Sequence, residues 1–208
     1  MTPAETLARG LESLGLPLPK EASGKLLAYV DLLAKWNRTY NLTAIREPER
    51  MVTHHLIDSL AVLPYLPAGS LVDIGAGGGL PGIPIAIAQP ERQVVLNDSN
   101  HKKGAFMQQA AIELGLTNVE VHIGRAEEWH PPERFDGAVS RAFAELSDYI
   151  ATCRHLVKTD GFFAAMKGLY PDDEIARLPQ DIQCDPARKL EVPLIEGERH
   201  FLLCRARP

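Results

Sequence analysis

The first third of the chain carries a helical pattern of hydrophobic positions. Between residues 25 and 36 the apolar side chains recur every three or four positions, and the charged side chains fall between them. This pattern predicts an amphipathic helix over 25–36 that packs on a larger body. A second helix is predicted to begin at Glu47-Pro48-Glu49, because proline and acidic residues are favoured in a first helical turn, and to continue over 51–63.

From residue 67 onward, short apolar runs alternate with helical stretches. The predicted strands are 71–74, 93–97, 119–123, 135–139 and 161–166, and the predicted helices are 80–88, 101–114 and 144–156. Such alternation is typical of right-handed crossovers and a mostly parallel sheet. Two further runs, 190–194 and 200–205, predict a C-terminal hairpin. We therefore expect an α/β protein, with a helical extension over 1–66 and a sheet domain over 67–208, forming one compact unit.

The composition describes a globular chain without a general affinity for nucleic acid. The 208 residues are 45% hydrophobic and 24% charged, which suits one domain with an extension. Lys and Arg total 22 against 27 Asp and Glu, so the net charge is -5. No global basic field attracts a polyanion, which excludes a general nucleic-acid coat protein. Any basic patch must be local.

Export, membrane insertion and metal binding are all disfavoured. Cys153, Cys184 and Cys204 are an odd number without C-x-x-C spacing, which predicts neither a disulfide framework nor a zinc site. The N-terminus lacks a signal-peptide pattern, and no apolar run approaches the roughly 18 residues that span a bilayer. The adjacent His54 and His55 would diverge on a helix. A cytoplasmic protein without a metal site is expected.

The stretch from Leu71 to Gly82 is the most informative in the chain. The predicted strand 71–74 runs straight into a loop with glycine at four of five positions, and Pro81 and Pro84 open the next helix. Backbone amides at such a helix start form an anion site, and missing side chains let a ligand approach closely. A simple connecting turn explains one or two glycines but not four. The loop therefore predicts a ligand site.

Two acidic residues favour S-adenosylmethionine over a dinucleotide as the ligand of this glycine loop. The formal dinucleotide fingerprint begins at Gly77, too late after the strand. Asp73, two residues before the loop, repels a pyrophosphate but suits a ligand with an ammonium and a sulfonium. Asp98, at the end of the next strand, is placed to accept hydrogen bonds from ribose hydroxyls. The alternative is that Asp98 caps the following helix.

The pattern V-D-I-G-A-G-G-G, followed by an acid at the second strand end, resembles the S-adenosylmethionine-dependent methyltransferase superfamily. Longer stretches resemble the bacterial ribosomal RNA small subunit methyltransferase G family, also called glucose-inhibited division protein B. These stretches, which cover nearly the whole chain, are Asn41-Leu-Thr43, His55-Leu-Ile-Asp58-Ser59, Gly79-Leu-Pro-Gly-Ile-Pro84, Phe135-Asp-Gly-Ala-Val-Ser-Arg-Ala142, Met166-Lys-Gly168 and Gly197-Glu-Arg-His200. The resemblance implies a Rossmann-like class I methyltransferase fold with a mostly parallel seven-stranded sheet. It also implies methyl transfer from S-adenosylmethionine to N7 of one guanine in 16S ribosomal RNA.

The resemblance extends to individual cofactor-binding residues. Gly75 and Leu80 match family positions that contact the cofactor, and the pair at 126–127 matches the residues beside the adenine. Where this chain has Asn97, relatives commonly show an apolar residue, a departure that leaves the carboxylate of Asp98 intact. The expected cofactor-binding residues are Asp73, Gly75, Gly77, Leu80, Asp98, Ala126, Glu127 and Arg141.

Basic side chains near the strand ends predict a local RNA-binding surface. Arg141, after the fourth strand, can clamp a carboxylate or a phosphate with two parallel hydrogen bonds. We expect Arg141 or Lys167 to orient the substrate, with a surface ion pair as the alternative for Arg141. For lysines generally, a solvated face is the commoner explanation. The expected RNA contacts are Arg38, Arg46, Lys102, Lys103, Lys167, Arg199 and His200.

Three further groups have a structural and a functional interpretation. His55 and Asp58, three residues apart on a helix, can dock the N-terminal helices, which we favour, or contact the substrate. Trp36 and Tyr40 can pack the extension or stack a splayed guanine. The run 172–174 is interpreted as a solvated acidic turn that is unsuited to RNA contact.

The chemistry of guanine N7 predicts catalysis without a general base. N7 has a free lone pair in the ring plane, so its attack on a sulfonium methyl releases no proton at N7. Orientation, which can supply about 7–11 kcal/mol, is then the main effect. Methyltransferases of exocyclic amines often carry N/D-P-P-aromatic after the fourth strand, where this chain has Ser140-Arg141-Ala142. No essential proton-transfer residue is predicted.

Two other functions stay open from the residues alone. One is a methyltransferase for a small molecule or a protein, with the helical extension as a lid. The other is a nucleotide-binding module or a dinucleotide oxidoreductase. For the favoured function, the expected partner is 16S ribosomal RNA or the small ribosomal subunit, and the expected state is a monomer without membrane contact.

Overall fold

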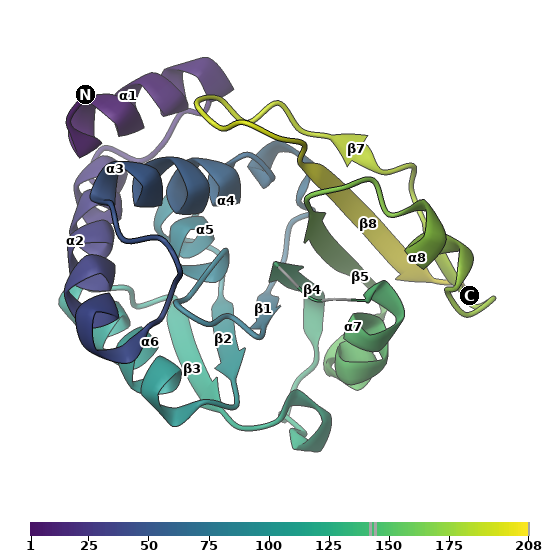
Figure 1. The fold of residues 1–208 in the computed structure, drawn as a ribbon. Helices are drawn as coiled ribbons and strands as arrows, with labels where there is room; N and C mark the ends of the chain where they lie inside the picture. Colours follow the sequence, from purple (N-terminus) through teal and green to yellow (C-terminus); the bar gives the residue numbers. More distant parts are fainter. Residues whose placement is uncertain (142, 144, 208) are drawn as a thin grey trace.

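The structure, a computed structural model, describes residues 1–141, 143 and 145–207. Within them the strands form one sheet in the order β3-β2-β1-β4-β5-β8-β6, with β7 paired to β8 (Figure 1). The pairs among β1 to β5 are parallel, and β8 runs antiparallel to β5. The strands are β1 (Leu71–Ile74), β2 (Val94–Asp98), β3 (Val119–Ile123), β4 (Phe135–Arg141), β5 (Val157–Lys167), β6 (Ile182–Cys184), β7 (Arg188–Lys189) and β8 (His200–Ala206).

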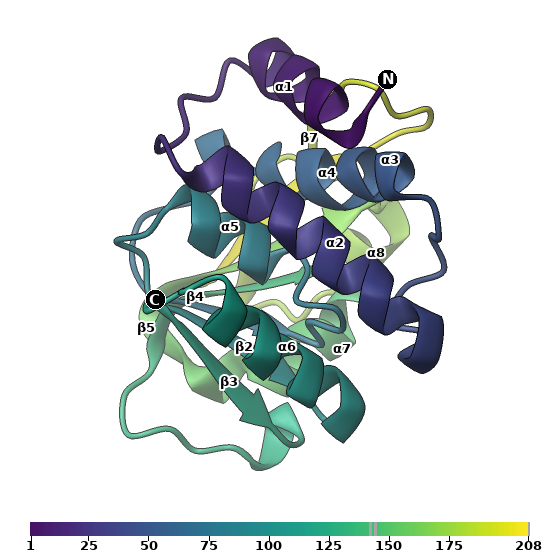
Figure 2. The same ribbon diagram turned by 90° about the vertical axis from the view of Figure 1, so that its left-hand side faces the viewer.

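Helices cover both faces of this sheet. Figure 2 shows α2, α5 and α6 together on one face, whereas α7 lies on the other. A π-helical turn, η1 (Val52–Ile57), joins α3 to α4, and η3 (Ala126–Glu128) is a short 3₁₀ turn after β3. The helices are α1 (Pro3–Leu14), α2 (Ala22–Tyr40), α3 (Pro48–Met51), α4 (Asp58–Leu60), α5 (Gly82–Ala88), α6 (His101–Glu113), α7 (Leu146–Cys153) and α8 (Asp172–Ala176).

The alternation of side chains along the strands builds two cores. Leu71 and Val139 face the helices of the N-terminal side, whereas their neighbours Val72 and Ala138 face α7. Leu33 of α2 belongs to the same core as Leu71 and is fully buried. The N-terminal helices therefore pack directly on the sheet rather than standing apart from it.

The α/β class, the parallel strands and the helical first third of the chain are confirmed. The predicted helix 25–36 lies inside α2, and α3 begins at Pro48 as predicted. The sheet follows a path of seven strands, to which the two-residue β7 is added. Ala144, the predicted first residue of the third helix of the sheet domain, lies outside the described residues, and α7 begins at Leu146.

The predicted strand over 190–194 is wrong. The segment that pairs with β8 is β7, two residues earlier, and β6 was not predicted at all. Pro193 has no N–H to donate, and Leu194 has a φ of 66°, so neither residue can continue a regular ladder. β7 and β8 do form an antiparallel hairpin. Its first strand, β7, is short and ends before the predicted strand begins.

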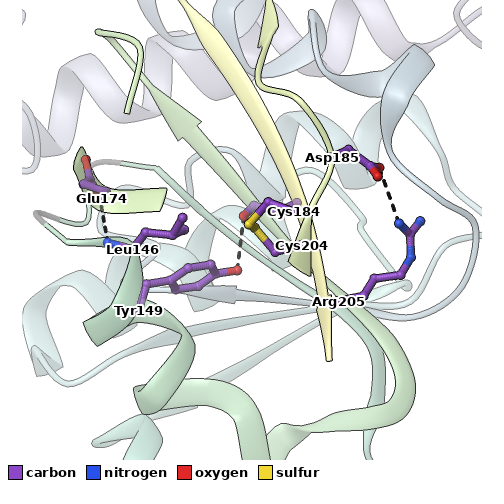
Figure 3. Close-up of a disulfide and its surroundings, with 8 residues drawn as sticks. Leu146, Tyr149, Glu174, Cys184, Asp185, Cys204 and Arg205 are labelled. Atoms are coloured by element: carbon purple, nitrogen blue, oxygen red, sulfur yellow. Dashed lines mark hydrogen bonds and ion pairs between the residues drawn. A yellow bond between two sulfur atoms is a disulfide. The ribbon is translucent and has the colours of Figure 1, made fainter. Parts of the chain in front are cut away.

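The expectation of no disulfide is also wrong. Cys184 of β6 and Cys204 of β8 are joined by a disulfide (Figure 3). They are register partners on antiparallel strands, so their side chains point to the same side of the sheet. Cys153 is free and buried. The spacing of cysteines along the chain does not reveal a pairing that depends on β6, a strand the sequence pattern missed.

Candidate functional site

The glycine loop joins β1 to α5 at the carboxyl end of the parallel strands. Gly75, Gly77 and Gly79 have φ angles of 68°, 60° and 84°, in the left-handed region that favours glycine. A Cβ at Gly77 would meet nothing nearer than the Gly75 carbonyl oxygen, at 3.9 Å, whereas a Cβ at Gly79 would overlap Ile83. A Cβ at Gly75 would lie 3.6 Å from Phe143 Cε2. The loop is therefore most open to a ligand at Gly77, bordered by the Phe143 ring at Gly75 and closely packed at Gly79.

Asp73 lies beneath this loop and is fully buried. Its Oδ2 accepts a hydrogen bond from Gly82 N at 2.7 Å, and its Oδ1 has no hydrogen-bond partner. Burial raises the pKa of Asp73 to about 7, although the bond from Gly82 opposes the rise. Because the side chain has no exposed surface, it acts on a ligand of the loop through its charge rather than by contact.

We expect Asp73→Asn to become more stable relative to the wild type as the pH rises. Between about pH 4 and pH 7 the folded wild type holds a proton on Asp73 that the unfolded chain releases, so its stability falls with rising pH. The amide does not titrate. The difference in unfolding free energy should grow by up to about 1.4 kcal/mol per pH unit and level off above pH 7. Urea unfolding at several pH values measures it, with the exposed Asp31→Asn as a control. A difference that stays flat would contradict the buried, protonated carboxyl.

Asp98 lies at the end of β2, beside the open part of the loop. Its Oδ2 accepts a hydrogen bond from Gly77 N at 3.0 Å, and its Oδ1 accepts one from Asn100 N at 2.9 Å. A carboxylate can accept about four hydrogen bonds, so about two positions remain for hydroxyl groups. The N-cap of α6 is Asn100, whose side chain accepts from the backbone of Lys102 and Lys103. The interpretation of Asp98 as the helix cap is therefore wrong.

The remaining residues expected at the cofactor lie along the same sheet edge. Ala126 and Glu127 form part of η3, directly after β3, with Ala126 buried and Glu127 exposed. Asn97 donates to the Gly124 carbonyl oxygen at 3.0 Å and so ties the end of β2 to the end of β3. Leu80 is buried behind the loop.

Arg141, at the end of β4, is bound to the N-terminal extension. Its Nη1 donates to the His54 carbonyl oxygen at 3.0 Å and to Asp58 Oδ2 at 3.3 Å. The other oxygen of Asp58 accepts from Arg199 Nε at 2.9 Å. The Asp58 side chain is 6% exposed, and those of Arg141 and Arg199 are 22% and 26% exposed. The carboxylate that Arg141 clamps in this structure is thus Asp58, in a half-buried network rather than a surface pair.

His55 extends this network as a neutral imidazole. Its Nδ1 lies 3.4 Å from Arg141 Nη2, which can only donate, so Nδ1 accepts. The proton is then on Nε2, which donates to Thr43 Oγ1 at 2.8 Å. Burial and the charge of Arg141 lower the pKa of His55 to about 4. The structure agrees with the interpretation that His55 and Asp58 dock the N-terminal helices.

A cleft of about 1030 Å³ opens at the carboxyl ends of β4 and β5. Its size is at the upper end of the range for ligand pockets. Among the described residues its lining carries four Lys or Arg side chains and five Asp or Glu side chains, and three of the acidic ones belong to α8. The titratable residues that line the cleft are His54, His55, Asp58, Arg141, Glu145, Lys167, Asp172, Asp173, Glu174, Arg177, Arg199 and His200.

Lys167 lines the cleft, but its ammonium is held by the protein. Its Nζ donates to the Phe143 carbonyl oxygen at 2.9 Å and to Glu174 Oε2 at 2.6 Å, and its side chain is 10% exposed. Glu174 also accepts a hydrogen bond from Leu146 N at 2.8 Å (Figure 3). The interpretation of the run 172–174 as solvated is therefore wrong for Glu174, which ties α8 to the start of α7.

The predicted RNA contacts separate into two groups. Arg199, His200 and Lys167 meet Arg141 in the cleft, where His200 is buried. Arg46 bonds Asn41 Oδ1 at 2.7 Å. Arg46 and three other basic residues do not line the cleft: Arg38 lies exposed on α2, and Lys102 and Lys103 lie at the start of α6.

Trp36 and Tyr40, for which stacking on a base was one of two interpretations, also lie outside the cleft. Trp36 packs against Phe106 and Tyr40, with ring centroids 5.6 Å and 5.3 Å apart, on a separate shallow surface of α2 and α6. The aromatic rings that line the cleft belong to Phe143 and Tyr170, which no sequence motif singled out. Their place in the cleft depends on the loops after β4 and β5.

Two features are absent from the described part of the chain. No group of three or more His, Cys, Asp or Glu residues is arranged there to hold a metal ion. In the same residues, no helix combines the length and the apolar character that crossing a membrane requires.

Comparison with known proteins identifies the family. Residues 22–202 match the family described as rRNA small subunit methyltransferase G. The chain is 52% identical over 204 residues, 98% of each chain, to Ribosomal RNA small subunit methyltransferase G of Neisseria meningitidis serogroup C. It is 50% identical over 197 residues, 94% of each chain, to the protein of the same name from Chromobacterium violaceum.

Solved structures of methyltransferases share the fold. The O-methyltransferase TomG from Streptomyces achromogenes, solved with S-adenosylmethionine, superposes with a TM-score of 0.61 at 15% identity and 100% coverage of both chains. A SAM-dependent methyltransferase from Aquifex aeolicus gives a TM-score of 0.58 at 18% identity, covering 83% of this chain and 97% of the other. The class I methyltransferase fold is therefore confirmed. The chain belongs to the rRNA small subunit methyltransferase G family.

Proposed function

We propose that this chain transfers a methyl group from S-adenosylmethionine to N7 of a specific guanine in 16S ribosomal RNA. One observation carries the proposal beyond family membership. The open glycine loop with Asp98 and the large cleft with Arg141 lie at the same carboxyl edge of the sheet, on neighbouring strands. A cofactor site and a substrate site side by side are what a group-transfer enzyme requires.

The residues around the loop fit S-adenosylmethionine. The space above Gly75 and Gly77 admits the methionine part, and Asp98 has acceptor positions left for the ribose hydroxyls. Asp73 beneath the loop, whose pKa of about 7 leaves it partly ionised at neutral pH, favours a cationic ligand through that charge. Ala126 and Glu127 would flank the adenine. When bound, the cofactor supplies an electrophilic methyl group on its sulfonium.

We propose that the protein accelerates the reaction mainly by orienting the guanine, with Arg141 and Lys167 holding the cleft in shape. N7 attacks through its own lone pair, so no proton has to leave it. The buried titratable groups of the cleft are engaged in the protein: His55 bonds Thr43, Asp58 lies between two arginines, and Glu174 holds Lys167. Orientation of this kind can supply about 7–11 kcal/mol.

The net charge is -5, and the described lining of the cleft carries four Lys or Arg side chains against five Asp or Glu side chains. This balance favours recognition of the shape of a folded RNA over binding of RNA in general through charge. We propose that Arg199 faces the RNA at the cleft, and that Arg38, Arg46, Lys102 and Lys103 contact phosphates farther out. His200 is buried and supports the cleft from within rather than contacting the RNA. The enzyme would act as a monomer in the cytoplasm, on 16S ribosomal RNA or the small ribosomal subunit.

Transfer of a labelled methyl group tests the proposal. Small subunits and 16S ribosomal RNA that lack the modification are incubated with the protein and labelled S-adenosylmethionine, and the digested RNA is analysed for 7-methylguanosine. We expect label in one guanine. Label only in small molecules or in protein would contradict the acceptor, and tight NAD binding without S-adenosylmethionine binding would contradict the cofactor. The same assay compares naked RNA with assembled subunits as substrate.

A further inference from the structure

Tyr170 presents an aromatic ring to the substrate cleft. Three tyrosines among the described residues are largely exposed: Tyr40 at 42%, Tyr65 at 39% and Tyr170 at 44%. Tyr40 packs on Trp36 outside the cleft, and Tyr65 lies beneath the guanidinium of Arg188, 4.5 Å from its ring centroid. Of these three exposed rings, the one that lines the cleft is Tyr170.

The segment that carries Tyr170 is fixed on both sides. Before it, the Gly168 carbonyl oxygen lies 3.2 Å from His200 Nδ1; a carbonyl only accepts, so the proton of His200 is on Nδ1. The His200 ring packs against Tyr170 with centroids 5.3 Å apart and an interplanar angle of 80°. After it, Glu174 holds Leu146 N and Lys167 Nζ. The ring is therefore positioned before any ligand arrives.

We propose that Tyr170 is the stacking platform for the guanine that is methylated, an inference that rests on the proposed function. Bases that are splayed out of an RNA loop bind to proteins by stacking on aromatic rings. The cleft of about 1030 Å³ has room for an unstacked nucleotide, and the cleft begins at Arg141, next to the strand that carries the glycine loop. A ring already held in place loses little freedom when a base stacks on it.

The charge of the product strengthens this contact. Methylation breaks the bond from sulfur to the methyl carbon and forms the bond from N7 to that carbon, so the positive charge of the sulfonium passes to the guanine ring. The face of a tyrosine attracts a cation. Stacking on Tyr170 therefore stabilises the methylated ring more than the neutral guanine, and part of this gain is present in the transition state.

The test compares Tyr170→Ala and Tyr170→Phe with the wild type in the methylation of unmodified small subunits. We expect kcat/KM to fall about 5- to 150-fold in Tyr170→Ala, the range seen when a stacked aromatic is removed. Tyr170→Phe should stay within about twofold of the wild type, because it keeps the ring. The affinity for S-adenosylmethionine should be unchanged in both, since the ring lines the cleft and not the glycine loop. Tyr40→Ala, an equally exposed tyrosine outside the cleft, is the matched control.

The outcomes separate this inference from the proposed function. A wild-type protein that does not methylate the RNA overturns the proposed function itself. An active wild type with unchanged kcat/KM in Tyr170→Ala overturns the stacking inference alone. An equal loss in Tyr170→Phe and Tyr170→Ala also overturns it, because the hydroxyl would then be the contact. Thermal melting of each variant checks that the exposed substitution leaves the fold intact.

Discussion

Asp58→Ala should lower the free energy of unfolding by about 3 kcal/mol, because it leaves two guanidinium groups without their shared carboxylate. The side chain of Asp58 is 6% exposed and accepts hydrogen bonds from Arg141 and Arg199. Removing one member of a buried ion network lowers stability by more than the intact network adds to it, because the remaining charges stay in a poorly solvated site. About a quarter of each arginine side chain stays exposed to solvent. We therefore place the loss of unfolding free energy at the lower end of the range for buried pairs.

Urea unfolding at neutral pH measures this loss, and the chain offers a matched control. Asp181 pairs with Arg154 at 2.6 Å, but both side chains are about half exposed, at 51% and 47%. Asp181→Ala should therefore leave the free energy of unfolding nearly unchanged, because exposed ion pairs contribute little to stability. A loss of similar size in the two variants would show that water replaces Asp58 without penalty.

The position of Asp58 gives the same substitution a functional consequence. The residue lies at the junction of η1 and α4, Arg141 ends β4, and Arg199 precedes β8. One carboxylate thus joins the N-terminal extension, the parallel sheet and the C-terminal hairpin at the mouth of the cleft. We propose on this basis that residues 1–66 and 67–208 unfold as one cooperative unit, and that methylation is lost in Asp58→Ala before the fold is.

The features that the sequence predicts are those that local patterns determine. Strands β1, β2, β4 and most of β5 are buried on both faces, whereas β3 is partly exposed, so the apolar runs of the buried strands are visible in the sequence. The left-handed φ angles of the loop favour glycine. Asp98 was predicted from its place at the end of the second strand. Its unused acceptor positions follow from its two backbone bonds, which the sequence does not show.

The features that the sequence misses depend on contacts between distant segments. The first strand of the hairpin was placed two residues too late, because nothing local marks the short β7. Lys167 and Glu174, seven residues apart, become a half-buried pair because the loop after β5 folds back over the start of α7. Tyr170 reaches the cleft for the same reason. The sequence pattern around the lysine, the acidic turn and the tyrosine has no periodicity. It therefore does not reveal that the loop after β5 folds back over the start of α7.

Asp98→Ala is expected to weaken the binding of S-adenosylmethionine about 100-fold. Two hydrogen bonds from ribose hydroxyls to a carboxylate would be lost, each worth about 1.5 kcal/mol or more, and about 3 kcal/mol corresponds to a factor of about 100 in Kd. Calorimetric titration measures Kd for the wild type and the variant. Asp160→Ala, an exposed carboxylate on β5 and outside the cleft, is the control and should bind normally.

Titration with adenosine distinguishes a ribose contact from an effect on the loop. Asp98 also accepts the hydrogen bond of Gly77 N, so its removal releases a loop residue that faces the methionine part of the ligand. A ribose contact predicts an equal loss of affinity for adenosine and for S-adenosylmethionine, because both carry the same two hydroxyls. A loss confined to S-adenosylmethionine would instead assign Asp98 to the support of the glycine loop. Unchanged affinity for both ligands would remove Asp98 from the cofactor site, and with it the fit of that site to a nucleoside.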